Sequence, residues 1–304
     1  MFHIRKFPVI LLCLIWITSF LYAQTEDMKE PKTAKDFDAL ARDHAAKGEN
    51  EKAIEVYHKI IHDFPKDAIY SIEALQGLGR CYSSLGDQAK AIESYRQLIN
   101  DYSASAIVLS NRQNMPANVY INWNIPLRIG EIYQEMGKYE EAQKELDKAR
   151  GYADALLSDK TLPESGKALY MHNYRVFFEA SINLYLKQGK LMETAKEYDQ
   201  MIQFTSDFLN SGLVDKSPSF VNKEKIKCIL TSLIEIQDPM KAAALYEKLG
   251  DREKAGKIYQ NIDLKIASAL ENKKYEKNLP VFHQELPGLQ KTVREKLKIF
   301  KSKM

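Results

Sequence analysis

One short stretch of the chain combines residue types that take part in chemistry. Residues 77–86, GLGRCYSSLG, hold closely spaced glycines, a cysteine beside an arginine, and two serines. Glycines at such spacing can cradle a phosphate with backbone N–H groups, and Cys81 beside Arg80 could act as a nucleophile. Whether these residues form a site depends on the elements that position them.

The remaining candidate chemistry is sparse. His58 and His62 are four residues apart, so they share one helix face and could hold a metal, but no third ligand accompanies them at a recognisable spacing. The chain has no His-Glu-x-x-His, P-loop or nucleophile-elbow motif. Acidic pairs such as Glu140 and Glu141 are typical of a solvated helix face. The sequence therefore predicts no enzyme, no cofactor and no metal site.

A pattern centred on a glycine recurs five times, at Gly48, Gly86, Gly137, Gly189 and Gly250. Apolar residues at offsets of 3, 4 and 7 precede and follow each glycine, which predicts one buried stripe on each of two short helices. The glycine permits the left-handed backbone that ends the first helix. Small residues such as Gly79, Gly130 and Ala91 let the two helices approach closely. A single pair cannot bury its stripes, so successive pairs must stack.

This pattern resembles the tetratricopeptide repeat (TPR), a helix-turn-helix unit of about 34 residues. The segments GLGRCYSSLGDQAKAIESYRQLI and ALARDHAAKGENEKAIEVYHKIIHDFP carry the resemblance best, and it extends over residues 34–264. It implies an all-α fold, an α-solenoid of about five TPR-like helical hairpins with extra helices and a C-terminal capping helix. In the way its repeats are joined, the chain is similar to periplasmic members of the family.

The spacing of the turn glycines predicts where extra structure lies. They are 38, 51, 52 and 61 residues apart, so the last three gaps must hold longer helices, loops or an added helix. We expect a helix over 219–236, followed by Asp238 as an N-cap and Pro239 in the first turn. Residues 103–122 are the best candidate for a functional loop, and a longer connection is the alternative.

The resemblance also implies a binding groove, lined by the first helix of each pair. If the family geometry carries over, its polar residues include Asp38, Arg42, Gln76, Arg80, Glu131 and Asn183. Arg42 and Arg80 occupy equivalent places in successive repeats and could hold one acidic ligand. The alternative is local pairing, for example of Arg42 with Asp38 one turn away. The Lys and Asn with which some family members grip a free C-terminal carboxylate are absent from these places.

The charge of the chain is unevenly distributed. Its net charge is +3, yet residues 264–304 alone carry ten Lys and Arg against four Glu. Within this end, Leu289, Val293, Leu297 and Phe300 share one helix face. We expect a helix that caps the core, with weak contact to an anionic membrane surface or to an acidic partner as the alternative. Nucleic acid is not an expected partner, because the rest of the chain is acidic.

The N-terminus has the layout of a secretory signal. Arg5 and Lys6 precede a mostly apolar run from Val9 to Ala23, after which the chain turns polar. We expect cleavage after Ala23 and a periplasmic or envelope location, with an uncleaved membrane anchor as the alternative. Cys13 lies within the apolar run, so no lipid anchor is expected. The remaining Cys81 and Cys228 could form at most one disulfide.

The sequence thus predicts four regions: a signal peptide at 1–23, a short linker at 24–33, an α-solenoid at 34–264 and a basic helical cap at 265–304. It predicts a non-enzymatic exported scaffold that binds a protein or peptide in the cell envelope through its concave face. The alternative is a cell-wall-associated protein that binds glycan or assists an enzyme, with its site in the loop at 103–122.

Overall fold

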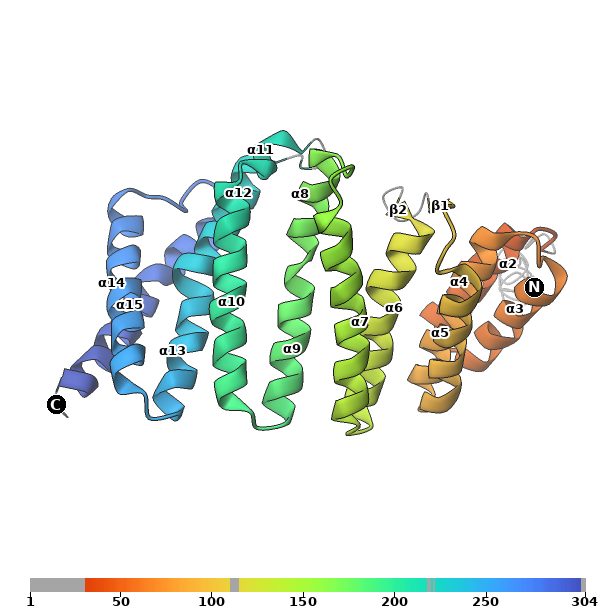
Figure 1. Ribbon diagram of the computed structural model, residues 1–304, viewed down its shortest axis with the longest axis horizontal. Helices are drawn as coiled ribbons and strands as arrows, with labels where there is room; N and C mark the ends of the chain where they lie inside the picture. The colour runs from red at the N-terminus through yellow and green to blue at the C-terminus, as the bar shows by residue number, and fades with distance from the viewer. Residues whose placement is uncertain (1–30, 110–114, 218–219, 221, 302–304) are drawn as a thin grey trace, which may run out of the picture. The chain divides into compact units, whose positions relative to one another are not determined.

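The computed structural model describes residues 31–109, 115–217, 220 and 222–301 (Figure 1). The chain divides into two compact units, 1–101 and 102–304. Each unit is built from antiparallel helical pairs. The expected signal peptide and most of the expected linker lie outside the described residues.

The first unit consists of two helical pairs. The first pair is α2 (Ala34–Ala46) with α3 (Asn50–Asp63), and the second is α4 (Ala68–Ser84) with α5 (Gln88–Tyr102). Thr33 starts α2 with a capping box, in which its hydroxyl accepts from the Asp36 backbone N–H and the Asp36 carboxylate accepts from the Thr33 N–H. Small and aromatic side chains, among them Ala41, Ala53 and Tyr57, fill the space between the helices.

The second unit begins with a minimal two-stranded ladder and continues as helical pairs. Strands β1 (Val108–Leu109) and β2 (Met115–Pro116) pair antiparallel, with Val108 opposite Pro116. The next pair is α6 (Ala117–Glu135) with α7 (Tyr139–Ser158), and the following pair is α9 (Arg175–Lys187) with α10 (Leu191–Asn210). Helix α8 (Glu164–Asn173) is inserted between α7 and α9.

The last third of the second unit contains the fifth pair and two additions. The short helix α11 (Leu213–Lys216) leads to α12 (Lys223–Ser232), which runs through a π-helical turn, η2 (Leu233–Gln237), directly into α13 (Asp238–Lys248). Helix α13 pairs with α14 (Arg252–Glu271), and α15 (Pro280–Lys301) packs along α14. Figure 1 shows α9, α10, α13 and α14 following one another side by side.

The five turn glycines behave as the sequence predicts. Their backbone φ angles lie between 69° and 82°, in the left-handed region that residues other than glycine rarely adopt; the five are Gly48, Gly86, Gly137, Gly189 and Gly250. Each glycine ends the first helix of its pair and reverses the chain into the second. The predicted all-α fold of stacked helical hairpins is confirmed.

Three local expectations differ from the structure. Asp238 is not an N-cap, because its backbone is helical and the chain runs unbroken from α12 into α13. Residues 117–122, expected in a loop, form the first turns of α6. The side-chain amide of Asn122 donates to the carbonyls of Ser103 and Asn118, and these hydrogen bonds stabilise the start of the helix. The expected boundary at 264/265 falls within α14.

The apolar stripe of the basic C-terminal helix faces the core. Val293 and Phe300 are buried, Leu289 and Leu297 are partly buried, and the Phe300 ring stacks on Tyr259 of α14 with centroids 6.0 Å apart. Helix α15 therefore packs on the fifth pair, as expected of a capping helix. No helix among the described residues is long and apolar enough to cross a membrane.

Candidate partner-binding face

The six predicted groove residues all lie on first helices of their pairs. Asp38 and Arg42 are on α2, and Gln76 and Arg80 are on α4, all in the first unit. Glu131 is on α6 and Asn183 is on α9, in the second unit.

In the first unit, Arg42 joins two helices. Its Nε donates to Asp38 Oδ2 at 2.7 Å, and its Nη2 donates to Glu73 Oε2 at 2.8 Å. The Glu73 side chain is only 1% exposed, so the pair ties α2 to α4 from within. The local pairing of Arg42 with Asp38, which the sequence left as an alternative, is present. The repeat spacing does not identify Glu73 as a partner of Arg42, although Glu73 is the one charged residue between Asp67 and Arg80 in the sequence.

Arg80 is the cation of this cluster that stays available. It is exposed, and it makes no hydrogen bond or ion pair with any residue in the described part of the chain, whereas Arg42 is held by two carboxylates. Burial raises the pKa of Asp38, and the charges of Arg42 and Arg80 oppose that rise. Gln76 is buried within α4 and is not presented to solvent. An acidic group of a partner would therefore pair with Arg80 and not with Arg42.

In the second unit, the structure brings Glu131 and Asn183 to one cleft. The cleft has a volume of about 60 Å³ and lies among α6, α7 and α9. Its lining consists of Leu127, Gly130, Glu131, Gln134, Ala142, Leu146, Val176, Ala180 and Asn183. Glu131 also receives a hydrogen bond from Arg128 on its own helix, at 2.8 Å. The cleft combines an apolar floor with amide and carboxylate groups.

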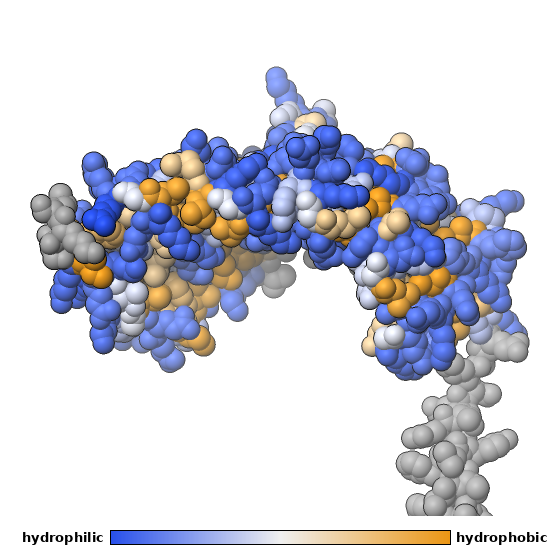
Figure 2. Space-filling view, turned by 90° about the horizontal axis from the view of Figure 1, so that it is seen from below, coloured by the Kyte–Doolittle hydropathy of each residue, from blue (hydrophilic) through white to orange (hydrophobic). Residues whose placement is uncertain are grey.

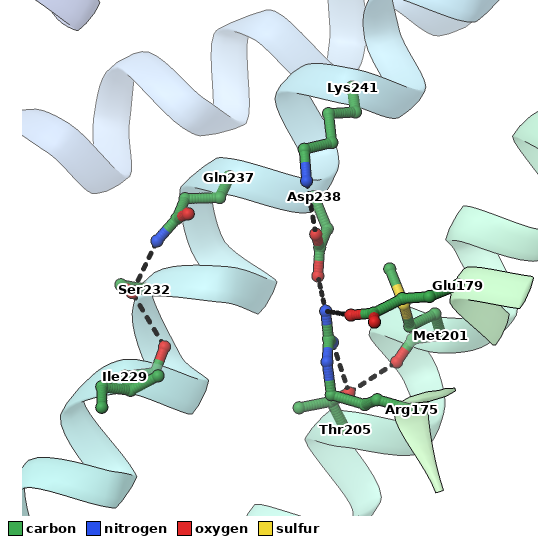
Figure 3. Close-up of polar contacts among 9 residues, drawn as sticks. All are labelled: Arg175, Glu179, Met201, Thr205, Ile229, Ser232, Gln237, Asp238 and Lys241. Atoms are coloured by element: carbon green, nitrogen blue, oxygen red, sulfur yellow. Dashed lines mark hydrogen bonds and ion pairs between the residues drawn. The ribbon is translucent and has the colours of Figure 1, made fainter. Parts of the chain in front are cut away.

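Two further arginines connect successive pairs in the second unit. Arg150 of α7 donates to Ser181 of α9 at 3.1 Å and to Glu197 of α10 at 2.5 Å. Arg175 of α9 donates to Thr205 of α10 at 3.0 Å and to Asp238 of α13 at 2.9 Å (Figure 3). The Asp238 side chain is fully buried and the Arg175 side chain is 12% exposed. These groups are engaged within the fold.

The other candidate chemistry does not form a site. His58 lies 3.1 Å from the Tyr82 hydroxyl and His62 lies 2.7 Å from an Asp63 carboxylate oxygen, both on exposed surface. Among the described residues no group of three His, Cys, Asp or Glu could hold a metal ion. Cys81 and Cys228 are both free and buried, and burial raises the pKa of each thiol. A buried thiol of raised pKa is a poor nucleophile.

The surface of the molecule gives no sign of one dominant apolar patch on the face in view. Figure 2 shows hydrophobic residues in several groups separated by hydrophilic ones. Recognition on such a surface would combine small apolar contacts with hydrogen bonds and charge.

Comparison with known proteins supports this class. Residues 73–105 and 127–150 match family models described as the tetratricopeptide repeat. Both segments begin in the first helix of a pair and contain its turn glycine, Gly86 or Gly137. The chain therefore contains tetratricopeptide repeats, and these repeats indicate a protein-interaction scaffold. No curated protein matches the sequence.

Several solved structures are similar at low identity. A tetratricopeptide repeat protein from Parabacteroides merdae is 15% identical, with 93% of this chain and 90% of that chain covered and a TM-score of 0.40. PilF of Pseudomonas aeruginosa is 15% identical, with 89% and 97% covered and a TM-score of 0.42. BtubC (BKLC) from P. vanneervenii is 15% identical, with 77% and 80% covered and a TM-score of 0.44.

Proposed function

We propose that this TPR protein is an exported, non-enzymatic scaffold that binds a protein or peptide partner in the cell envelope. Within each unit, the partner contacts the first helices of the pairs. The observation that carries this proposal is the cleft of the second unit, which joins Glu131 of α6 to Asn183 of α9 over an apolar floor. The exposed Arg80 supports it in the first unit.

Export and envelope location rest on the N-terminal sequence. The basic residues Arg5 and Lys6, the apolar run to Ala23 and the polar chain that follows form the layout of a secretory signal. Helix α15 packs its apolar stripe on α14, so a membrane would meet mainly its charged residues, together with the exposed Val281 and Ile299. Any contact with anionic lipid would therefore be electrostatic and would weaken with salt.

Site-directed photo-crosslinking in intact cells tests the proposal. A photoreactive amino acid replaces Arg80 or Asn183 on first helices, and Glu93 of α5 or Lys196 of α10 as exposed controls on second helices. We expect one defined protein adduct from the first-helix positions, identified by mass spectrometry. Equal capture from all four positions would contradict the proposed face, and capture of glycan alone would favour a cell-wall ligand.

A further inference from the structure

We propose that the cleft of the second unit binds a small aliphatic side chain of the partner, with a lysine or arginine next to it in the partner's sequence. This inference rests on the proposed function and specifies the chemistry of the ligand. It concerns only α6, α7 and α9, which lie within one unit.

The size of the cleft limits what can enter. Three lining residues are small, namely Gly130, Ala142 and Ala180, and they leave the space among the three helices open. A single water needs about 10–15 Å³ by this measure, so a cleft of about 60 Å³ holds roughly four atoms of comparable size. An isopropyl or isobutyl group fits this space, whereas an aromatic ring does not.

The floor of the cleft favours an apolar occupant. Leu127, Leu146 and Val176 supply aliphatic surface, and Val176 is 37% exposed despite being apolar. Covering this surface with a valine or leucine side chain removes apolar area from water on both partners. The gain is modest for one side chain, so the neighbouring contacts must add to it.

The rim provides groups that bind a peptide backbone. Asn183 and Gln134 carry amides that can each donate to a carbonyl and accept from an N–H. They lie on different helices, α9 and α6, on the lining of the same cleft. A peptide whose aliphatic side chain enters the cleft would have its backbone within reach of these amides.

Charge identifies the neighbouring residue of the partner. Glu131 and Glu179 on α6 and α9 have side chains that are 55% and 59% exposed. The Arg128 that pairs with Glu131 is itself 60% exposed, and such surface pairs contribute little, so a partner cation can replace it. Arg175 lies 3.9 Å from Glu179, but its shorter contacts are with Thr205 and Asp238. Glu131 lines the cleft and Glu179 directly precedes the lining residue Ala180 on α9, so a lysine or arginine of the partner next to the cleft complements this negative charge.

Immobilised synthetic heptapeptides provide the probe. Their central residue is Gly, Ala, Val, Leu or Phe, the next residue is Lys, Gln or Glu, and all other positions are Gly or Ser. We expect the purified full chain to bind Val-Lys and Leu-Lys peptides at least about tenfold more tightly than Gly-Lys, Phe-Lys or Leu-Glu peptides.

Two variants assign the preference to the cleft. Ala180→Met fills the cleft with its own side chain and should reduce the preference for Val and Leu to less than about twofold, whereas Ala267→Met on the exposed side of α14 should leave it unchanged. Glu131→Gln should remove most of the discrimination between Lys and Gln, and Glu140→Gln on α7 should not. Circular dichroism confirms that each variant is folded.

The outcomes separate this inference from the function on which it rests. Binding without a preference at the centre, a preference for Phe, or a preference for Glu would overturn the inference. So would a preference that survives Ala180→Met. If crosslinking through Asn183 still captures one protein in cells, the proposed function stands while the ligand chemistry is wrong. If neither assay detects binding, both are wrong.

Discussion

The two glycines that first suggested a phosphate-binding loop are contact positions within a helix. Residues 77–84 belong to α4, in which Gly77 faces Tyr57 of α3 and Gly79 faces Tyr95 of α5. A Cβ added to Gly77 would lie 2.3 Å from Tyr57 Cζ, and a Cβ added to Gly79 would lie 2.5 Å from Tyr95 Cζ. Each glycine therefore receives a buried tyrosine ring from a neighbouring second helix. Helix packing, and not phosphate binding, therefore accounts for the closely spaced glycines of GLGRCYSSLG.

We predict that Gly79→Ala lowers the free energy of unfolding by about 1–3 kcal/mol, because the Tyr95 ring must move within a packed core. Gly151→Ala in α7 is the control. Nothing lies within 4 Å of its added Cβ, so the better helix propensity of alanine should raise stability by about 0.5–1 kcal/mol. Thermal and urea unfolding measure both changes, and a loss of stability in both variants would contradict the packing argument.

The buried pair of Arg175 and Asp238 makes a second prediction at this scale. Asp238→Leu leaves the Arg175 guanidinium without its carboxylate inside the fold, and we expect a loss of about 3–5 kcal/mol. The double variant Arg175→Met/Asp238→Leu removes both charges and should be more stable than the single variant. Urea unfolding of the three proteins checks this order, and a double variant as unstable as the single one would show that the pair does not act as a unit.

The candidate site was only partly predictable at the level of residues. Family spacing placed Glu131 and Asn183 on first helices, and the structure puts both on one cleft. The spacing could not show that Gln76 is buried, because burial depends on tertiary packing. It also could not show that Arg42 is held by Glu73, which lies 31 residues away in the sequence. The cleft itself depends on small residues from three helices, and no single segment shows it.

At the level of elements, the helical pairs were predictable and the insertions were not. A turn glycine and a stripe of period 3.6 are local signals, and every predicted pair is present. The passage from α12 to α13 is different. Asp238 and Pro239 look like a helix start, yet the π-helical turn at Leu233–Gln237 carries the chain through without a break, and tertiary pairing of Asp238 with Arg175 holds it there.

The inserted elements α8, α11 and α12 share a small hydrophobic cluster, and the half-buried His172 lies beside it. Ala168, Phe208, Val214, Phe220 and Leu230 form this cluster. The ring of His172 packs edge-on against Phe220 at 5.2 Å, and its Nδ1 is buried without a hydrogen-bond partner among the described residues. Burial, and to a smaller extent the charge of Arg175, lowers the pKa of His172.

This geometry predicts an acid sensitivity. Because the pKa of His172 is lower in the folded state than its unfolded value of about 6.5, the unfolded chain binds the proton more readily. The contribution of His172 to stability is complete above about pH 6.5 and is lost as the pH falls below it. We expect melting temperatures at pH 7.5 and 5.5 to differ less for His172→Leu than for the wild type. The exposed His62→Gln should behave as the wild type, and an unchanged difference in His172→Leu would refute the assignment.

At the level of the whole molecule, composition and repeat spacing indicate the class of protein. The expected cellular location depends instead on the first residues of the chain. Net charge, aromatic content and the five turns are compatible with any compartment. Only the run from Val9 to Ala23 predicts export. The division into two compact units at 101/102 was not predictable from the repeat pattern, because the pattern continues across it.

Export is tested directly by the mass of the protein in cells. If the signal is cleaved after Ala23, the mature chain begins at Gln24, and intact-mass spectrometry of the envelope fraction should find that species alone. A lysine substituted for Leu12 interrupts the apolar run and should leave the uncleaved chain in the cell interior. Recovery of a chain that retains residues 1–23 in the membrane would instead support the anchor.

Three of the arginine bridges between helices share a direction along the chain, whereas Arg294 of α15 follows its partner Asp263 of α14. Arg42, Arg150 and Arg175 each precede their interhelical carboxylates, Glu73, Glu197 and Asp238, by 31, 47 and 63 residues. In a chain made from its N-terminus, each of these three arginines therefore precedes the buried carboxylate with which it will pair. A solvated arginine carries no desolvation penalty, and its charge is already present when the carboxylate is buried. Each junction can thus close as soon as its later helix emerges.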